Sequence, residues 1–155
     1  AVSLACHLPD ASFFAADISL DALEVSRKNI HHHGFSDRIA LVQSDLLGAI
    51  LNERFDLVVA NLPYIGEKEN RFISPDVERT EPHLALFGGH DGLSLYGNLF
   101  QQIFLLKHLP RFILGEFGFG QGNLLRKLLQ SFFGNNFRIV LDPAGIERVF
   151  IVSLF

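Results

Sequence analysis

The sequence contains no methionine and no tryptophan, and it has a single cysteine, Cys6. One cysteine cannot form an intramolecular disulfide or a cysteine-based zinc site, and we expect Cys6 to be a small buried side chain at an apolar helix end. No apolar run approaches about 18 residues and no signal peptide is visible, so no membrane-spanning helix is expected. Because position 1 is also not a methionine, we expect the chain to be a piece of a longer protein.

Charged residues are scarce too, at 19% of the 155 residues, whereas apolar residues make up 48%. This composition excludes a disordered chain and gives enough apolar surface for one ordinary domain. The 13 basic and 17 acidic residues give a formal net charge of −4. That balance argues against a general binder of nucleic acids or membrane surfaces, because phosphate binding needs a basic patch.

Predicted helices and strands alternate along the chain, which is typical of an α/β sheet with helices on both faces. Ser19 is a suitable N-cap and Gly34 a suitable C′ residue for one helix, and Asp91 can cap another. Ligands bind at the carboxyl ends of the strands in such sheets. The long segment 65–90 is predicted to be a functional loop. The predicted strands are 12–17, 39–42, 55–60, 112–116, 137–141 and 149–152. The predicted helices are one that ends over 1–7, one from the Ser19 cap to Gly34, one over 92–108, and one that the glycine-rich turn 118–122 opens and that runs to about Phe133.

The most informative string is Asn61-Leu62-Pro63-Tyr64, which follows the apolar strand predicted at 55–60. The Asn61 side-chain oxygen and the backbone carbonyl of Leu62 can each accept an N–H from a bound amide or amine. Tyr64 can stack on a flat substrate, and such a clamp fixes the orientation of a nitrogen toward an electrophile. The same four residues are also compatible with an ordinary turn after a strand, since Asn and Pro favour turns.

The tetrapeptide resembles the Asn-Pro-Pro-Tyr motif of S-adenosylmethionine-dependent amino-methyltransferases. Nearly the whole chain resembles the glutamine N5-methyltransferases that modify peptide chain release factors (the HemK/PrmC family). The most specific part of the resemblance is a string that is peculiar to that family. The matching segments are Ala16–Ser19, Val42–Leu47, Phe55–Ala60, Tyr64-Ile65, and the family-specific string Glu81–Leu93 with Tyr96.

This resemblance implies a role for each matching site residue. Asp17, with Ile18 beside it, would accept hydrogen bonds from the ribose hydroxyls of the cofactor. Asp45 and Leu46 would lie beside the adenine. Asn61 would contact both cofactor and substrate, and the substrate clamp would be completed by Leu62, Pro63 and Tyr64.

The resemblance also implies a Rossmann-like methyltransferase sheet, mostly parallel, with an antiparallel C-terminal hairpin and with its first strand absent from the chain. We expect the family's glycine-rich cofactor loop and N-terminal helical domain to be absent as well, so that residues 1–155 form a single, N-terminally truncated methyltransferase domain. Leu62 departs from the family pattern, which has proline there. The backbone carbonyl of residue 62 is present with either residue. Leu62 still precedes a proline and therefore favours extended backbone.

A competing pattern lies at Glu116-Phe117-Gly118-Phe119-Gly120-Gln121-Gly122, which fits the E-x-G-x-G-x-G form of a cofactor loop. It follows a strand and opens a helix, and Asp142 ends the next strand as a ribose-binding acid would. This pattern favours a permuted amino-methyltransferase acting on nucleic acid. The release factor family has a similar segment at the same place, where it only ends a later strand.

The resemblance implies methyl transfer from S-adenosylmethionine to the side-chain amide nitrogen of a glutamine in a release factor, with S-adenosylhomocysteine as product. A truncated scaffold without catalysis is the alternative of a different class. We expect a cytoplasmic monomer whose partner is the release factor, without direct contact to nucleic acid or membrane. No metal is expected, because the helical residues His31, His32 and His33 point in different directions.

Overall fold

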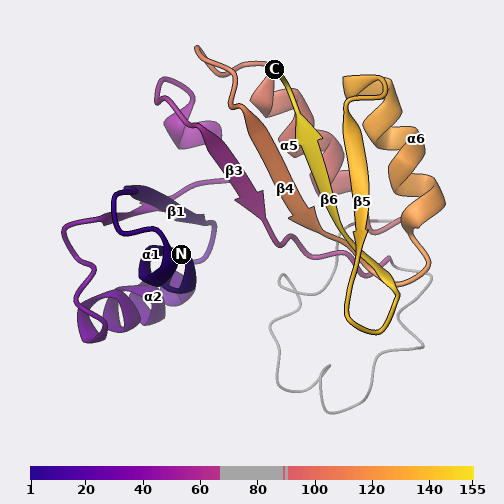
Figure 1. Ribbon diagram of the computed structural model, residues 1–155. Helices are drawn as coiled ribbons and strands as arrows, with labels where there is room; N and C mark the ends of the chain where they lie inside the picture. Colours follow the sequence, from indigo (N-terminus) through magenta and orange to yellow (C-terminus); the bar gives the residue numbers. More distant parts are fainter. Residues whose placement is uncertain (67–88, 90) are drawn as a thin grey trace. The chain divides into compact units, whose positions relative to one another are not determined.

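The computed structural model describes residues 1–66, 89 and 91–155 of the chain, and Figure 1 shows its helices and strands. By its contacts the chain divides into two compact units, Ala1–Leu51 and Asn52–Phe155. Each unit is described by itself, and the expectation of one domain over residues 1–155 stays a prediction. Residues 67–88 and 90 of the predicted functional loop lie outside the described residues.

The first unit is built on a pair of parallel strands. β1 (Phe13–Asp17) pairs with β2 (Ile39–Gln43) in a register that places Asp17 opposite Gln43. A small core of three buried apolar residues lies among its elements. The remaining elements are α1 (Val2–His7), α2 (Leu20–His32) and the short 3-10 helix η1 (Gly48–Ile50).

The ends of α2 follow the sequence prediction. The Ser19 side chain accepts a hydrogen bond from the N–H of Ala22 at 3.3 Å, and Gly34 follows the helix with a φ of +73°, the left-handed conformation expected of a C′ residue. The prediction for Cys6 was wrong, because its side chain is exposed. Only the neighbouring Ala5 of α1 is buried, and adjacent helical positions point in different directions.

The second unit holds a four-stranded sheet in the order β3-β4-β6-β5. β3 and β4 are parallel, while β4 and β5 both pair antiparallel with β6. The α/β fold and its antiparallel C-terminal hairpin therefore agree with the prediction. The strands are β3 (Leu57–Ala60), β4 (Phe112–Glu116), β5 (Phe137–Leu141) and β6 (Glu147–Ser153), and the helices are α5 (Ser94–Ile103) and α6 (Gly122–Phe133).

Helix α5 is shorter than the predicted span of 92–108. Gly92 has a φ of +73°, which is not helical, so the helix begins at Ser94. The Asp91 carboxylate still serves this helix start, because it accepts hydrogen bonds from the Leu93 N–H at 3.0 Å and the Ser94 hydroxyl at 3.2 Å.

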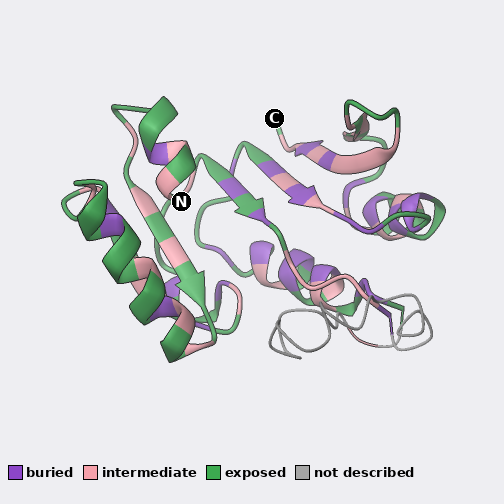
Figure 2. Ribbon diagram, turned by 90° about the horizontal axis from the view of Figure 1, so that it is seen from below, coloured by how far each residue is buried: buried purple, intermediate pink, exposed green. Residues whose placement is uncertain are grey.

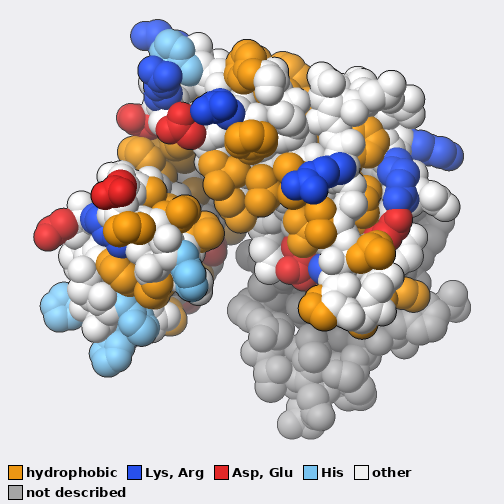
Figure 3. Space-filling model, viewed as in Figure 1, with side chains coloured by type: hydrophobic (Ala, Val, Ile, Leu, Met, Phe, Trp, Pro, Cys, Tyr) orange, Lys and Arg blue, Asp and Glu red, His pale blue; other side chains and the backbone are white. Residues whose placement is uncertain are grey.

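Apolar alternation along the strands gives the sheet of the second unit one well-packed face. Figure 2 shows that buried positions alternate with exposed or intermediate ones along β3 and β4. Phe100 of α5 contacts both Phe150 of β6 and Phe133 of α6, with ring centroids 5.8 and 5.0 Å apart, so both helices pack on this face. Other apolar side chains of β3 and β4, such as Val59 and Phe112, remain exposed. Figure 3 shows hydrophobic side chains gathered over these two strands.

Tyr96 of α5 joins this core to the carboxyl ends of two strands. Its side chain is fully buried and packs edge-on against Phe150, with ring centroids 5.1 Å apart. The hydroxyl donates to the carbonyl of Ala60 at the end of β3, at 3.3 Å, and to the carbonyl of Glu116 at the end of β4. Gly115 leaves room for this pair, because a Cβ there would lie 2.4 Å from the Phe150 ring and 2.9 Å from the Tyr96 ring.

Two glycine-to-alanine substitutions are expected to change stability in opposite directions. Gly115→Ala overpacks the two rings and is expected to lower the free energy of unfolding by about 1–3 kcal/mol. Gly97→Ala, in helix α5 with nothing within 4 Å of the added Cβ, is expected to raise it by about 0.5–1 kcal/mol. Urea unfolding of the two variants beside the wild type measures both changes. Equal changes in the free energy of unfolding for the two variants would show that Gly115 is not packed against the two rings.

The pKa of Tyr96 is raised, chiefly because burial disfavours the phenolate, and the nearby Glu116 carboxylate adds to this. A tyrosine whose pKa is higher in the folded state than in the unfolded state stabilises the fold as long as the pH lies below the pKa of the unfolded chain, about 10. This stabilisation is lost as the pH rises further. Tyr96→Phe is expected to cost about 1–3 kcal/mol at pH 7, because two carbonyls lose a donor. The difference between wild type and variant is expected to shrink above a pH of about 10. Unfolding curves measured from pH 7 to 11 test this, and a constant difference would contradict it.

Candidate functional site

Asp17 and Ile18 lie at the carboxyl end of β1, in the first unit. The Asp17 carboxylate is exposed and accepts the Ser19 N–H at 2.8 Å through Oδ1, which leaves Oδ2 without a hydrogen bond to any described residue. The Asp17 backbone carbonyl accepts the Ser44 N–H at 3.0 Å. The exposed Ile18 follows, and its carbonyl accepts the Gln43 side-chain N–H at 3.3 Å. A carboxylate held in this way has one oxygen that can accept a ligand hydroxyl.

Asp45 and Leu46 lie beside this position, after the end of β2. Asp45 is exposed, and Leu46 is half-buried with a φ of +53°, a conformation that non-glycine residues adopt rarely. The buried Ser44 hydroxyl accepts the Ala49 N–H at 3.0 Å, which holds this turn in place. Four of the five residues predicted for the cofactor, all except Asn61, therefore come together at the carboxyl ends of two paired parallel strands.

The predicted clamp residues follow β3, in the second unit. Asn61 is exposed, and its side-chain amide makes no hydrogen bond to any described residue. The Leu62 carbonyl is likewise without a donor among the described residues, while the Leu62 backbone N–H contacts the Tyr96 hydroxyl. Two acceptors of the kind that an amide N–H requires thus lie at the end of this strand, and no described residue donates to either of them.

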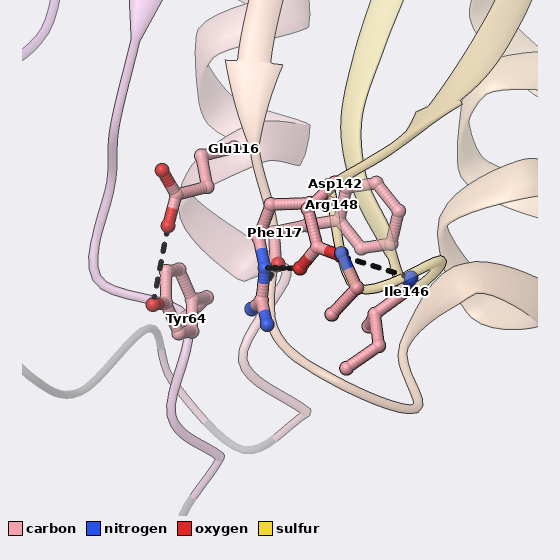
Figure 4. A network of polar contacts seen from close by, with 7 residues as sticks. Tyr64, Glu116, Phe117, Asp142, Ile146 and Arg148 are labelled. Carbon is pink, nitrogen blue, oxygen red and sulfur yellow. Dashed lines mark hydrogen bonds and ion pairs between the residues drawn. The ribbon is translucent and has the colours of Figure 1, made fainter.

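Tyr64 completes the clamp and is anchored at both of its ends. Its hydroxyl donates to Glu116 Oε1 at 3.4 Å, and its carbonyl accepts a hydrogen bond from the Gln121 side chain at 2.6 Å. Figure 4 shows the hydroxyl pointing toward Glu116 from the neighbouring loop. Burial, and next the Glu116 carboxylate, raise the pKa of Tyr64, while Arg148 opposes this. The phenol is therefore neutral at physiological pH, with a fixed ring orientation.

The glycine-rich segment after β4 turns back onto the clamp. Gly118 and Gln121 close a turn through the hydrogen bond from the Gln121 N–H to the Gly118 carbonyl at 3.3 Å, and α6 begins immediately afterwards. Phe117 is tied to β6, because its N–H donates to the Arg148 carbonyl at 3.0 Å and its carbonyl accepts from the Arg148 side chain at 3.3 Å. Figure 4 includes this connection.

Asp142, the ribose-binding acid of the permuted alternative, is engaged by its own turn. Its Oδ1 accepts the N–H groups of Ala144 and Ile146 at 2.9 and 3.0 Å, and its Oδ2 lies 3.7 Å from Arg148 Nε. A carboxylate satisfied in this way has less capacity to bind ribose hydroxyls than the Asp17 carboxylate.

A cavity of about 510 Å³ lies near the amino-terminal ends of β3 and β4, lined by residues that include Arg54, Lys107 and Arg111, and none of its lining residues belongs to the clamp. Among the described residues, no group of three or more His, Cys, Asp or Glu side chains could hold a metal ion. No described helix has the length and apolar character that crossing a membrane requires.

Sequence reasoning missed three residues that contact the clamp. Tyr96 was noted only as part of a family string, and Glu116 and Gln121 were read as parts of a glycine pattern. A Gln at a buried helix start, or a Tyr on an apolar helix face, indicates a polar side chain that is hydrogen-bonded to the backbone of another segment. Most of the family string itself, residues 81–88 and 90, lies outside the described residues.

Comparison with known proteins identifies the family and the fold. Residues 1–81 match the model of the methyltransferase small domain family. The chain is 32% identical over 152 residues to the release factor glutamine methyltransferase of Staphylococcus aureus, covering 96% of this chain and 54% of that protein. The corresponding enzyme of Moorella thermoacetica is 36% identical over 152 residues, with 97% and 53% covered. A bifunctional methyltransferase of Rickettsia typhi is 34% identical over 154 residues, with 99% and 30% covered. The chain thus spans about half the length of the first two relatives, and less of the third.

Solved structures share the fold. The hMettl16 catalytic domain, in complex with MAT2A 3'UTR hairpin 6, aligns with a TM-score of 0.73 at 17% identity, covering 98% of this chain and 59% of that one. The ribosomal protein L11 methylase of Lactobacillus delbrueckii subsp. bulgaricus aligns with a TM-score of 0.61 at 22% identity, with 98% and 63% covered. These likenesses confirm the Rossmann-like methyltransferase fold. The relatives confirm the resemblance to the release factor glutamine methyltransferases, and the chain belongs to the methyltransferase small domain family.

Proposed function

We propose that this protein transfers a methyl group from S-adenosylmethionine to the side-chain amide nitrogen of a glutamine in a peptide chain release factor. The observation that carries the proposal is the pair of available acceptors at the end of β3, the Asn61 side chain and the Leu62 carbonyl, beside the anchored ring of Tyr64. The relatives named release factor glutamine methyltransferases support the substrate.

The residues at the ends of β1 and β2 fit the nucleoside part of the proposed cofactor. Asp17 Oδ2 can accept a ribose hydroxyl while Oδ1 keeps its bond to Ser19. Leu46 offers an apolar side chain beside the exposed Asp45, which suits an adenine ring and its polar edge. The cofactor supplies an electrophilic methyl group on a sulfonium.

The clamp supplies orientation for a weak nucleophile. In the proposed reaction a bond forms between the amide nitrogen and the methyl carbon, the carbon–sulfur bond breaks, and the nitrogen loses one proton. We assign no strong base to this step. Asn61 and Leu62 accept the two N–H groups of the substrate amide and thereby stabilise the positive charge that develops on its nitrogen. Tyr64 packs against the flat amide and excludes water.

The proposed partner is the release factor, which is met in the cytoplasm, and we propose that the protein acts as a monomer. We place no nucleic acid in the site, because the net charge is −4 and Asp142 is already engaged by its own turn.

Cofactor binding is expected to depend on the charge of Asp17. Asp17→Asn keeps an oxygen for the Ser19 N–H but removes the charge, and we expect it to raise the Kd for S-adenosylmethionine about tenfold or more, as for loss of a charged hydrogen bond. Asp21→Asn is the matched control, since Asp21 is exposed in the first turn of α2. Calorimetric titration of the protein in its full natural length measures both. No binding by the wild type at high micromolar cofactor would favour the non-catalytic scaffold.

Methyl transfer is expected to depend on Asn61. Asn61→Ala removes one acceptor from the clamp, and we expect kcat to fall about 100-fold or more, as when one donor to a transition state is lost in other enzymes. Asn135→Ala is the control, because Asn135 is exposed and far along the chain, after α6. Transfer of labelled methyl groups to a release factor, and to the same factor with its acceptor glutamine replaced, measures the activity. Equal rates for the wild type and Asn61→Ala would contradict the proposed clamp.

A further inference from the structure

A single buried amide, the side chain of Gln121, connects three segments around the clamp. Gln121 is only 4% exposed. Its Oε1 accepts the Gly118 N–H at 2.9 Å, and its Nε2 donates to the Tyr64 carbonyl at 2.6 Å and to the Asp91 carbonyl at 3.4 Å. The three partners lie in the loop after β4, the loop after β3 and the turn before α5.

Two glycines make this arrangement possible. A Cβ at Gly92 would lie 2.1 Å from the Tyr64 carbonyl oxygen and 2.4 Å from Gln121 Nε2. A Cβ at Gly118 would lie 2.9 Å from Gln121 Oε1 and 2.9 Å from the Tyr64 ring. Both positions therefore admit only glycine if the Gln121 side chain is to reach the Tyr64 backbone.

The hydrogen-bonding pattern also selects the residue type at position 121. The site presents one backbone donor and two backbone acceptors, which only an amide of this length can satisfy. Glutamate has the same shape but no donor when ionised, and asparagine is one methylene too short. A buried polar group with all its partners in place also resists displacement, because leaving the partners unpaired is costly.

We propose that Gln121 is a positioning residue that holds the backbone of Asn61–Tyr64 in the geometry that the substrate clamp requires. The Tyr64 carbonyl is fixed by Gln121 while the Tyr64 hydroxyl is fixed by Glu116. Because both the carbonyl and the hydroxyl of Tyr64 are fixed, its ring and the preceding Leu62 carbonyl keep a constant position relative to each other. The glycines of the 116–122 pattern then serve to bring this side chain to the clamp. This inference rests on the proposed function of the clamp.

The test compares Gln121→Glu and Gln121→Leu with Gln130→Glu, a change at an exposed position of α6. We expect both Gln121 variants to lower kcat for the release factor about 10- to 100-fold, as expected for a misplaced reacting group. The Kd for S-adenosylmethionine is expected to change less than about twofold, because four of its five proposed contact residues lie at the ends of β1 and β2 rather than in the clamp. Gln130→Glu is expected to match the wild type in both.

A pH profile separates positioning from mere stability. The carboxyl introduced by Gln121→Glu would be buried against two carbonyl oxygens, and in its protonated form it regains one donor. The ratio of its kcat to that of the wild type is therefore expected to rise as the pH falls from 8 to 6, whereas the ratio for Gln121→Leu stays flat. Flat ratios for both variants would overturn the proposal, as would equal losses in kcat and in cofactor affinity.

A measurement without turnover keeps the inference distinct from the proposed function. The ring signals of Tyr64 and Tyr96 can be followed by NMR in protein labelled at tyrosine and assigned with Tyr64→Phe. We expect Gln121→Glu to shift or broaden the Tyr64 signal and to leave that of Tyr96 in place. If the wild type transfers no methyl group, the proposed function fails while this readout still tests the contact. If the wild type is active and the Tyr64 signal does not move, the positioning role fails alone.

Discussion

The hydroxyl of Tyr96 is the contact on which the second unit depends. One O–H group reaches the carbonyl of Ala60 and the carbonyl of Glu116, and so fixes the carboxyl ends of two parallel strands to one helix. The ring below it is locked by Phe150, and that packing exists because Gly115 has no side chain. The core thereby determines where the chain leaves β3, and every clamp residue follows from that point.

Three glycines of this unit have the same structural role, which their sequence pattern does not indicate. Gly115 admits two aromatic rings, and Gly92 and Gly118 admit the Gln121 side chain. In each case the missing Cβ allows close approach of a neighbouring group. A pattern of glycines after a strand is also typical of phosphate or cofactor loops, so sequence alone cannot distinguish the two uses. The partners of Asp142 and Gln121 distinguish them here.

Much of the fold could be predicted from the sequence, because local signals and apolar runs agree along most of it. The Ser19 cap, the Gly34 end and the strands over 112–116 and 137–141 were all predictable in this way. The start of α5 was not, since Gly92 has a positive φ and lies where the Tyr64 carbonyl, distant in sequence, leaves no room for a Cβ. The exposure of Cys6 was missed because a six-residue helix buries few positions. For the site, motifs predict roles for Asn61 and Asp17, and these roles stay predictions. Gln121 and Tyr96 bond to backbone atoms distant in sequence, and the strings that contain them do not reveal those partners.

In the proposed clamp Leu62 contributes only its carbonyl oxygen, and this has a consequence for how such a site is inherited. A backbone acceptor is present whatever the side chain is, so replacing Leu62 by another residue deletes no chemical group. The position of this acceptor is determined instead by the residues that set the path of the chain, Pro63 and Gln121 among them. Scanning mutagenesis of position 62 would therefore overlook it, whereas an ester in place of the peptide bond between residues 62 and 63 would weaken the carbonyl acceptor directly. Part of the proposed clamp therefore consists of a backbone atom that no substitution at position 62 removes.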